Sequence, residues 1–130
     1  MRLISTALML LAPVPALAQD FHCRNTDAEI RCSGGSCEVE AEKAGFTPME
    51  LRRTGNRLSI CSYSACWEGP IRMRRSYGGV TFLSAEVAIT SPGQPGHAPL
   101  SVMYEAADAT AQIRWLGFSN AMRCGAGADE

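Results

Sequence analysis

Six cysteines are the residues whose type and spacing carry the clearest chemistry in this chain, and they lie at Cys23, Cys32, Cys37, Cys61, Cys66 and Cys124. An even number in a short chain that begins with an export signal (described below) is typical of a disulfide framework. A zinc site is a poor alternative, because the close cysteine pairs have four residues between them and His22 and His97 do not form a ligand pair. A thioredoxin-like redox site would need a Cys-x-x-Cys motif, which the sequence lacks. The cysteines therefore predict three disulfides and no metal.

The spacing also favours particular pairs. Gly34 and Gly35 allow a tight turn that brings Cys32 to Cys37, within the distance that a disulfide requires. Cys61 and Cys66 have the same spacing with poorer turn residues, so they either close locally or each cross to another strand. The remaining pair, Cys23 with Cys124, would join the two ends of the domain. In the chain-entropy model that loop of about 100 residues stabilises by about 4–5 kcal/mol, and a six-residue loop by about 2.

The remaining reactive side chains do not form a catalytic motif. The sequence contains no Gly-x-Ser-x-Gly, His-Glu-x-x-His or phosphate-loop pattern. His22 and His97 are expected to be solvated, and the carboxylates of Glu38, Glu40 and Glu42 to share one exposed strand face. We therefore predict no catalytic residue and no cofactor, and a small hydrolase is the least favoured class of function.

Residues 1–18 have the layout of a secretory signal peptide. Arg2 precedes an apolar run over residues 3–12, and Ala16-Leu17-Ala18 supplies small residues before a cleavage site. The apolar run of about ten residues is too short for a membrane span, which needs roughly 20. No cysteine follows the site, so a lipid anchor is not expected. We predict a protein of the periplasm or the extracellular space that begins at Gln19, with no membrane span.

The rest of the chain predicts one disulfide-stapled domain over 19–124 and a disordered tail over 125–130. Alternating apolar residues and glycine-containing turns predict short antiparallel strands. The expected hairpins are 48–53 with 57–62, 71–77 with 80–89, and 100–105 with 111–118, and the Pro/Gly-rich segment 90–99 is expected to be a surface loop. Residues 37–45 favour a strand, with a short helix near 38–45 as the alternative. The predicted fold class is all-β, mainly antiparallel, as a small barrel or sandwich.

Arginines and a tyrosine on the 71–77 strand are the candidate partner-binding residues: Arg72, Arg74, Arg75 and Tyr77. Alternation places Arg72 and Arg74 on one strand face, and guanidinium groups suit carboxylates, phosphates or an acidic patch. The alternative is that these basic strands pair with acidic strands across the sheet. With 12 basic and 13 acidic residues, the chain has no electrostatic footprint for nucleic acid.

These features favour an exported, non-catalytic binding protein with a protein partner, for which an inhibitor of a hydrolase is one form. A structural accessory protein of the cell envelope is the alternative. The two chain ends, Phe21-His22-Cys23 and Met122-Arg123-Cys124, resemble those of periplasmic inhibitors of C-type lysozyme. The resemblance covers only these positions. The Ser-Gly-x-x-Tyr loop of that family is missing and four cysteines are additional, so no site residue is carried over.

Overall fold

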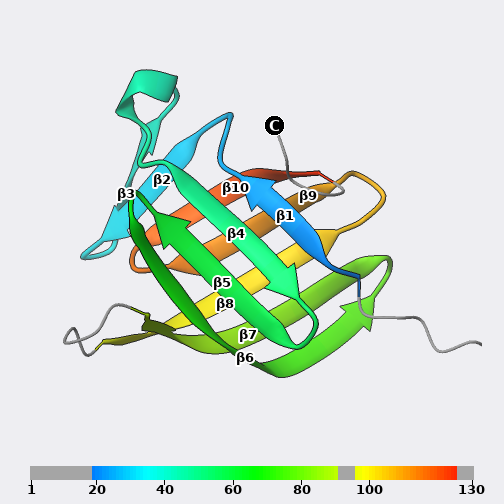
Figure 1. Ribbon diagram of the computed structural model, residues 1–130. Helices are drawn as coiled ribbons and strands as arrows, with labels where there is room; N and C mark the ends of the chain where they lie inside the picture. The colour runs from blue at the N-terminus through cyan, green and yellow to red at the C-terminus, as the bar shows by residue number, and fades with distance from the viewer. Residues whose placement is uncertain (1–18, 91–95, 126–130) are drawn as a thin grey trace, which may run out of the picture.

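The computed structural model describes residues 19–90 and 96–125, which form antiparallel strands joined by short connections (Figure 1). The predicted signal peptide and residues 126–130 of the predicted tail lie outside the described residues. The elements are β1 (Phe21–Arg24), β2 (Glu29–Ser33), β3 (Ser36–Glu40), the 3-10 turn η1 (Lys43–Gly45), β4 (Met49–Thr54), β5 (Arg57–Ser62), β6 (Ala65–Tyr77), β7 (Val80–Ile89), β8 (His97–Glu105), β9 (Thr110–Trp115) and β10 (Phe118–Gly125).

Eight of these strands close into a barrel. Their order around the wall is β1-β4-β5-β6-β7-β8-β9-β10, and pairing of β1 with β10 completes the circle. The prediction of an antiparallel all-β fold is confirmed, and of the two architectures left open the barrel is the one observed. Closure leaves no free strand edge within the wall itself, so a small chain satisfies its backbone hydrogen bonds without a second sheet.

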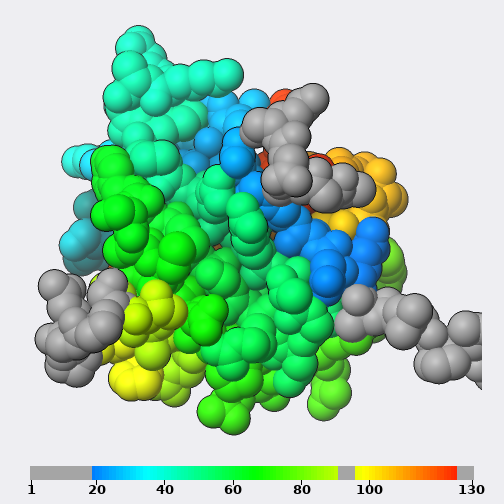
Figure 2. Space-filling view, viewed as in Figure 1, coloured from blue at the N-terminus to red at the C-terminus, as the bar shows by residue number. Residues whose placement is uncertain are grey.

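The β2–β3 hairpin stands outside this wall and projects from it together with η1 (Figures 1 and 2). The first residue of β10, Phe118, pairs with Arg31 of β2, whereas the last three residues of β10 pair with β1. The side chain of Asn120 accepts the Ile30 N–H at 2.8 Å. The fully buried carboxylate of Glu29 accepts the Thr47 N–H at 2.6 Å. These two side chains attach the hairpin and its exit segment to the barrel.

The barrel interior is filled by the inward-facing residues of every wall strand. Leu83, Ala85 and Val87 of β7 are buried on one face, as their alternation predicts, and so are Met49, Leu51, Leu58 and Ile60 of the first predicted hairpin. Aromatic rings complete the packing: Trp67 and Trp115 meet edge to face at 6.0 Å between ring centroids, and Phe118 packs against the same cluster. An eight-stranded barrel has an interior that side chains can fill, and the buried residues of this barrel form one hydrophobic core.

All three disulfides join directly opposed residues of neighbouring antiparallel strands. Cys23 and Cys124 link β1 to β10, Cys32 and Cys37 link β2 to β3, and Cys61 and Cys66 link β5 to β6. Cys32–Cys37 and Cys23–Cys124 are the pairs that were favoured, and of the two alternatives left open for Cys61 and Cys66, local closure is the one observed. The first bond lies across the pair of strands that closes the barrel.

Several predicted boundaries are wrong. His97, Ala98 and Pro99, expected in a loop, belong to β8, and Ala98 is buried in the core. Residues 111–118, expected as one strand, contain the end of β9, a turn at Leu116 and Gly117, and the start of β10. Gly125, assigned to the tail, still pairs with His22. Residues 37–45 contain both expected structures in succession, strand β3 and then the turn η1.

No helix among the described residues is long and apolar enough to cross a membrane.

Candidate functional site

The β6–β7 hairpin carries the four predicted binding residues, and a β-bulge determines which face of the sheet each of them lies on. The pairing of β6 with β7 shifts register between Ile71 and Met73, so Arg72 is an additional residue without a partner in β7. Because directly opposed residues share a sheet face, Arg74 lies on the inner face with the buried Leu83. The prediction that Arg72 and Arg74 lie on one regular strand face is wrong, because the bulge interrupts the alternation between them.

The outer face of the same hairpin holds the other two predicted residues. Arg75 is opposite Phe82, and Tyr77, with 85% of its surface exposed, is opposite Val80 at the turn. Met73, 44% exposed, and Phe82, 39% exposed, alternate with them on this face. The hairpin therefore presents apolar and cationic side chains together.

A groove of about 560 Å³ runs from this outer face across β7, β8 and β9 to β10. Its floor contains small side chains in register: Ser84 opposes Ser101, and both Ser101 and Ser119 oppose Arg114. Larger side chains border the floor, with Met73 and Phe82 at one side and Ile30 of the β2–β3 hairpin at the other. We call this feature the outer groove; the residues that line it are Ile30, Met73, Phe82, Leu83, Ser84, Ser101, Val102, Met103, Gln112, Ile113, Arg114, Ser119, Asn120 and Ala121.

Charge in and beside the outer groove is positive and lacks a carboxylate partner among the described residues. Of the described residues that line the groove, Arg114 is the only charged one, and its guanidinium donates to the Gly117 carbonyl at 3.2 Å. No ion pair within the described residues involves Arg72, Arg74 or Arg75. In other parts of the barrel and hairpin, arginines lie within ion-pair distance of acidic side chains: Arg24, Arg31, Arg52, Arg57 and Arg123.

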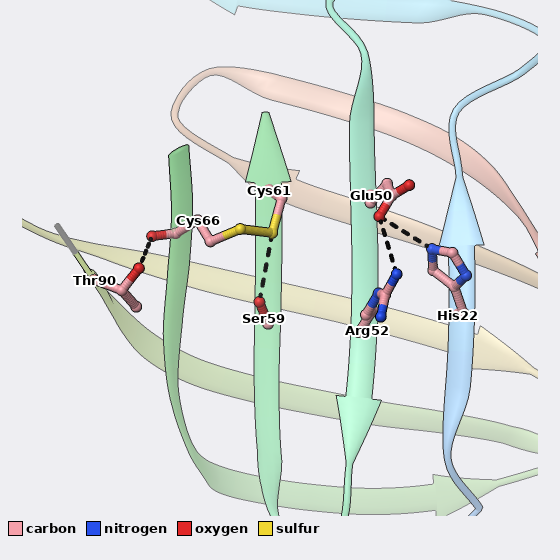
Figure 3. The surroundings of a disulfide bond; sticks show 7 residues. All are labelled: His22, Glu50, Arg52, Ser59, Cys61, Cys66 and Thr90. Atoms are coloured by element: carbon pink, nitrogen blue, oxygen red, sulfur yellow. Dashed lines mark hydrogen bonds and ion pairs between the residues drawn. A yellow bond between two sulfur atoms is a disulfide. The ribbon is translucent and has the colours of Figure 1, made fainter. Parts of the chain in front are cut away.

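A second hollow, of about 590 Å³, lies on the outer face of β4, β5 and β6 around the Cys61–Cys66 disulfide (Figure 3). Glu50 is its centre: its carboxylate lies 2.8 Å from Arg24, 3.3 Å from His22 and 3.5 Å from Arg52. Partial burial raises the pKa of Glu50, but the charges of these three residues outweigh burial and hold that pKa below its usual range. We call this feature the ion-paired hollow.

Other polar side chains in and beside the ion-paired hollow also have partners within the protein. Arg57 lies 2.9 Å from Glu68 across the strand pair, and the Ser59 hydroxyl lies 3.8 Å from the Cys61 sulfur. The Thr90 hydroxyl donates to the Cys66 carbonyl at 3.2 Å (Figure 3). Tyr63, at the turn between β5 and β6, borders the hollow and is 77% exposed.

Neither histidine is part of a nucleophile–base arrangement in the described residues. His22 faces Glu50, and the exposed His97 has its Nδ1 atom 3.9 Å from Glu86. Within residues 19–90 and 96–125, no group of three or more His, Cys, Asp or Glu side chains could hold a metal ion.

Sequence reasoning missed most of the outer groove. Its serines come from β7, β8 and β10, which are far apart in the chain and become neighbours only through strand register. The available signals were Phe82 and Met103, apolar residues at positions where alternation predicts exposure, whereas Met73 faces outward only because of the bulge.

No family model, no curated protein and no solved structure compared with the chain matches it. The resemblance of the chain ends to lysozyme inhibitors therefore stays a prediction.

Proposed function

We propose that this protein is an exported, non-catalytic binding protein that holds a macromolecular partner in the outer groove. The observation that carries the proposal is the combination of exposed Met73 and Phe82 with arginines that have no carboxylate partner among the described residues. Aromatic and methionine side chains and arginine are the residues enriched at protein interfaces.

The chemistry of the groove favours an extended partner segment with an apolar side chain and a carboxylate. The apolar side chain would lie against Met73 and Phe82 above the small serines. The carboxylate would pair with Arg114 or Arg75, where the planar guanidinium can donate two hydrogen bonds to two oxygens. Inhibition of a hydrolase is one form that such binding takes, and hydrolase activity in the partner would identify it.

Export is supported by the cysteines as well as by the signal-like residues 1–18. Three disulfides and no free cysteine in the described residues indicate an oxidising compartment. We expect the mature protein to begin at Gln19 in the periplasm or outside the cell, which mass spectrometry of the exported chain would test.

The outer groove is tested by site-specific photo-crosslinking in the native compartment. A photoreactive residue at Met103, in the groove, is compared with one at Ser59, in the ion-paired hollow. We expect a single partner band from position 103, which mass spectrometry identifies, and none from position 59. The purified partner should then bind the wild-type protein.

Equal crosslinking from both positions, or none from position 103, would contradict a binding role for the groove. In the second case a structural accessory role in the envelope becomes the better interpretation. A Ser101→Trp variant provides the matched control, because it fills the groove floor at an exposed position and should abolish the crosslink without unfolding the barrel.

A further inference from the structure

The end of the barrel where β4 meets β5 contains a buried arginine. Arg53 is 4% exposed and stands between Phe21 of β1 and Leu58 of β5 on the inner face. Its Nε donates to the Gly55 carbonyl at 3.2 Å. A guanidinium has five N–H donors, so this bond leaves most of its hydrogen-bonding capacity for other groups.

No carboxylate of the described residues forms an ion pair with Arg53. Asp20 is an acidic residue whose charge favours the charged form of Arg53, but its Oδ1 atom accepts the Gly55 N–H at 2.8 Å. Removing a charge from water without a close counterion is costly, and folded proteins rarely leave it uncompensated.

The positive charge of Arg74 disfavours the charged form of Arg53 further. The Ile71 N–H donates to the Asn56 carbonyl at 2.8 Å, which brings β6 against the β4–β5 turn three residues before Arg74. The bulge then directs Arg74 to the inner face. Burial lowers the pKa of the Arg53 guanidinium, the charge of Arg74 lowers it further, and Asp20 acts in the opposite direction.

Polar and aromatic groups complete this end of the barrel. Phe21 stacks on Tyr104 with ring centroids 4.2 Å apart, and Tyr104 is directly opposite Thr81. The hydroxyls of Thr81 and Ser76, on the same face as Arg74, are 3.1 Å apart. An aromatic floor with hydroxyls and two cations around it is suited to a small anion, and barrel mouths are common ligand sites.

We propose that this mouth binds an oxyanion, a carboxylate or phosphate group, between the guanidinium groups of Arg53 and Arg74. The anion supplies the negative charge that no described carboxylate provides in an ion pair, and it lies between two positive charges that otherwise repel each other. The site is distinct from the outer groove, because the bulge directs Arg74 inward and Arg75 outward.

The test is an NMR titration of the folded mature chain at constant ionic strength, with inorganic phosphate in one arm and acetate in the other. We expect saturable shifts of the Arg53 and Arg74 Nε–Hε signals and of the Gly55 amide. The arm with the tighter binding assigns phosphate or carboxylate as the preferred group. Arg74→Gln should weaken binding at least tenfold, whereas the matched control Arg72→Gln, at the additional residue of the bulge, should leave it unchanged.

Shifts that rise linearly in both arms without saturation would overturn the proposal. So would equal weakening by Arg72→Gln and Arg74→Gln, since it would mean that only the general positive charge of the hairpin matters. Arg53→Lys serves as a second variant: it keeps the charge but loses the planar fork, so binding should weaken although the barrel stays folded. Unchanged binding by a folded Arg53→Lys variant would contradict the role given to Arg53.

Discussion

The outer groove and the ion-paired hollow are two depressions of similar size on the outer face of one barrel, the groove over β7 to β10 and the hollow over β4 to β6. The groove has a volume of about 560 Å³ and the hollow about 590 Å³, and each crosses strands that are directly paired. Their charges differ. Glu50 in the hollow is surrounded by cations, whereas the groove and the neighbouring part of β6 have arginines and no acidic partner among the described residues.

This difference shows that concavity alone does not identify a binding surface. A partner that enters the hollow must first disrupt ion pairs that already satisfy the side chains there. A partner that enters the groove meets guanidinium groups that can donate hydrogen bonds to its carboxylate, beside apolar surface that water solvates poorly. The two depressions therefore differ in whether their charged side chains already have partners, and the variants below test this difference.

The largest expected effect is on partner binding through the groove. A Met73→Ser/Phe82→Ser variant should weaken binding of the crosslinked partner by about 100-fold, because both side chains would act as apolar anchors. The free energy of unfolding should change by less than about 0.5 kcal/mol, since both residues are partly exposed. Isothermal titration calorimetry and urea unfolding measure the two quantities. If this variant bound the partner with wild-type affinity, the groove would not be the binding surface, and it would no longer differ from the hollow in function.

The hollow should respond in the opposite sense. A Cys61→Ser/Cys66→Ser variant should lower the free energy of unfolding by about 2 kcal/mol, the entropy of a six-residue loop, and leave partner affinity unchanged. Urea unfolding of the wild type and the variant, both with the other two disulfides intact, gives the first value. A loss of affinity in a variant that remains folded would place the hollow in the binding surface.

The smallest effect concerns Glu50 and depends on pH. Because its folded-state pKa is lowered, its ion pairs stabilise the protein above the ordinary pKa of glutamate, and that stability is lost as pH falls through the lowered value. Glu50→Gln should therefore cost at most about 1 kcal/mol at pH 7, and the difference from wild type should shrink as the pH falls from 7 to below the ordinary pKa of glutamate. Thermal unfolding across this range measures it. A difference that grows on acidification would contradict the assigned sign.

The hairpins were predictable because local residues specify them. Gly78 and Gly79, with φ angles of 59° and 84°, adopt the left-handed conformation that a two-residue turn requires, and alternation fixed which residues face inward. The β9–β10 turn has a weaker signal: Gly117 adopts a φ of 85°, but the other turn residue, Leu116, has a φ of 45°, which a leucine rarely adopts. The two strands were therefore merged into one.

Both candidate sites depend on information that local pattern does not contain. The bulge after Ile71 is one additional residue, and it reverses the face on which every later residue of β6 lies. That reversal separates Arg74 from Arg72 and places it on the inner face, as Arg53 is, although Arg53 lies more than twenty positions earlier in the chain. The serines of the groove floor likewise meet only through the register of strands that the sequence leaves unpaired.

The Cys23–Cys124 bond has a mechanical consequence. It lies two residues from the end of β1 that begins at Phe21 and one residue before the last residue of β10, across the strands that close the barrel. Tension applied to the two chain ends is therefore carried by this covalent link, and the 100 residues between the two cysteines bear none of it. A domain anchored to a surface at one end and pulled at the other would keep its barrel, groove and mouth unstretched.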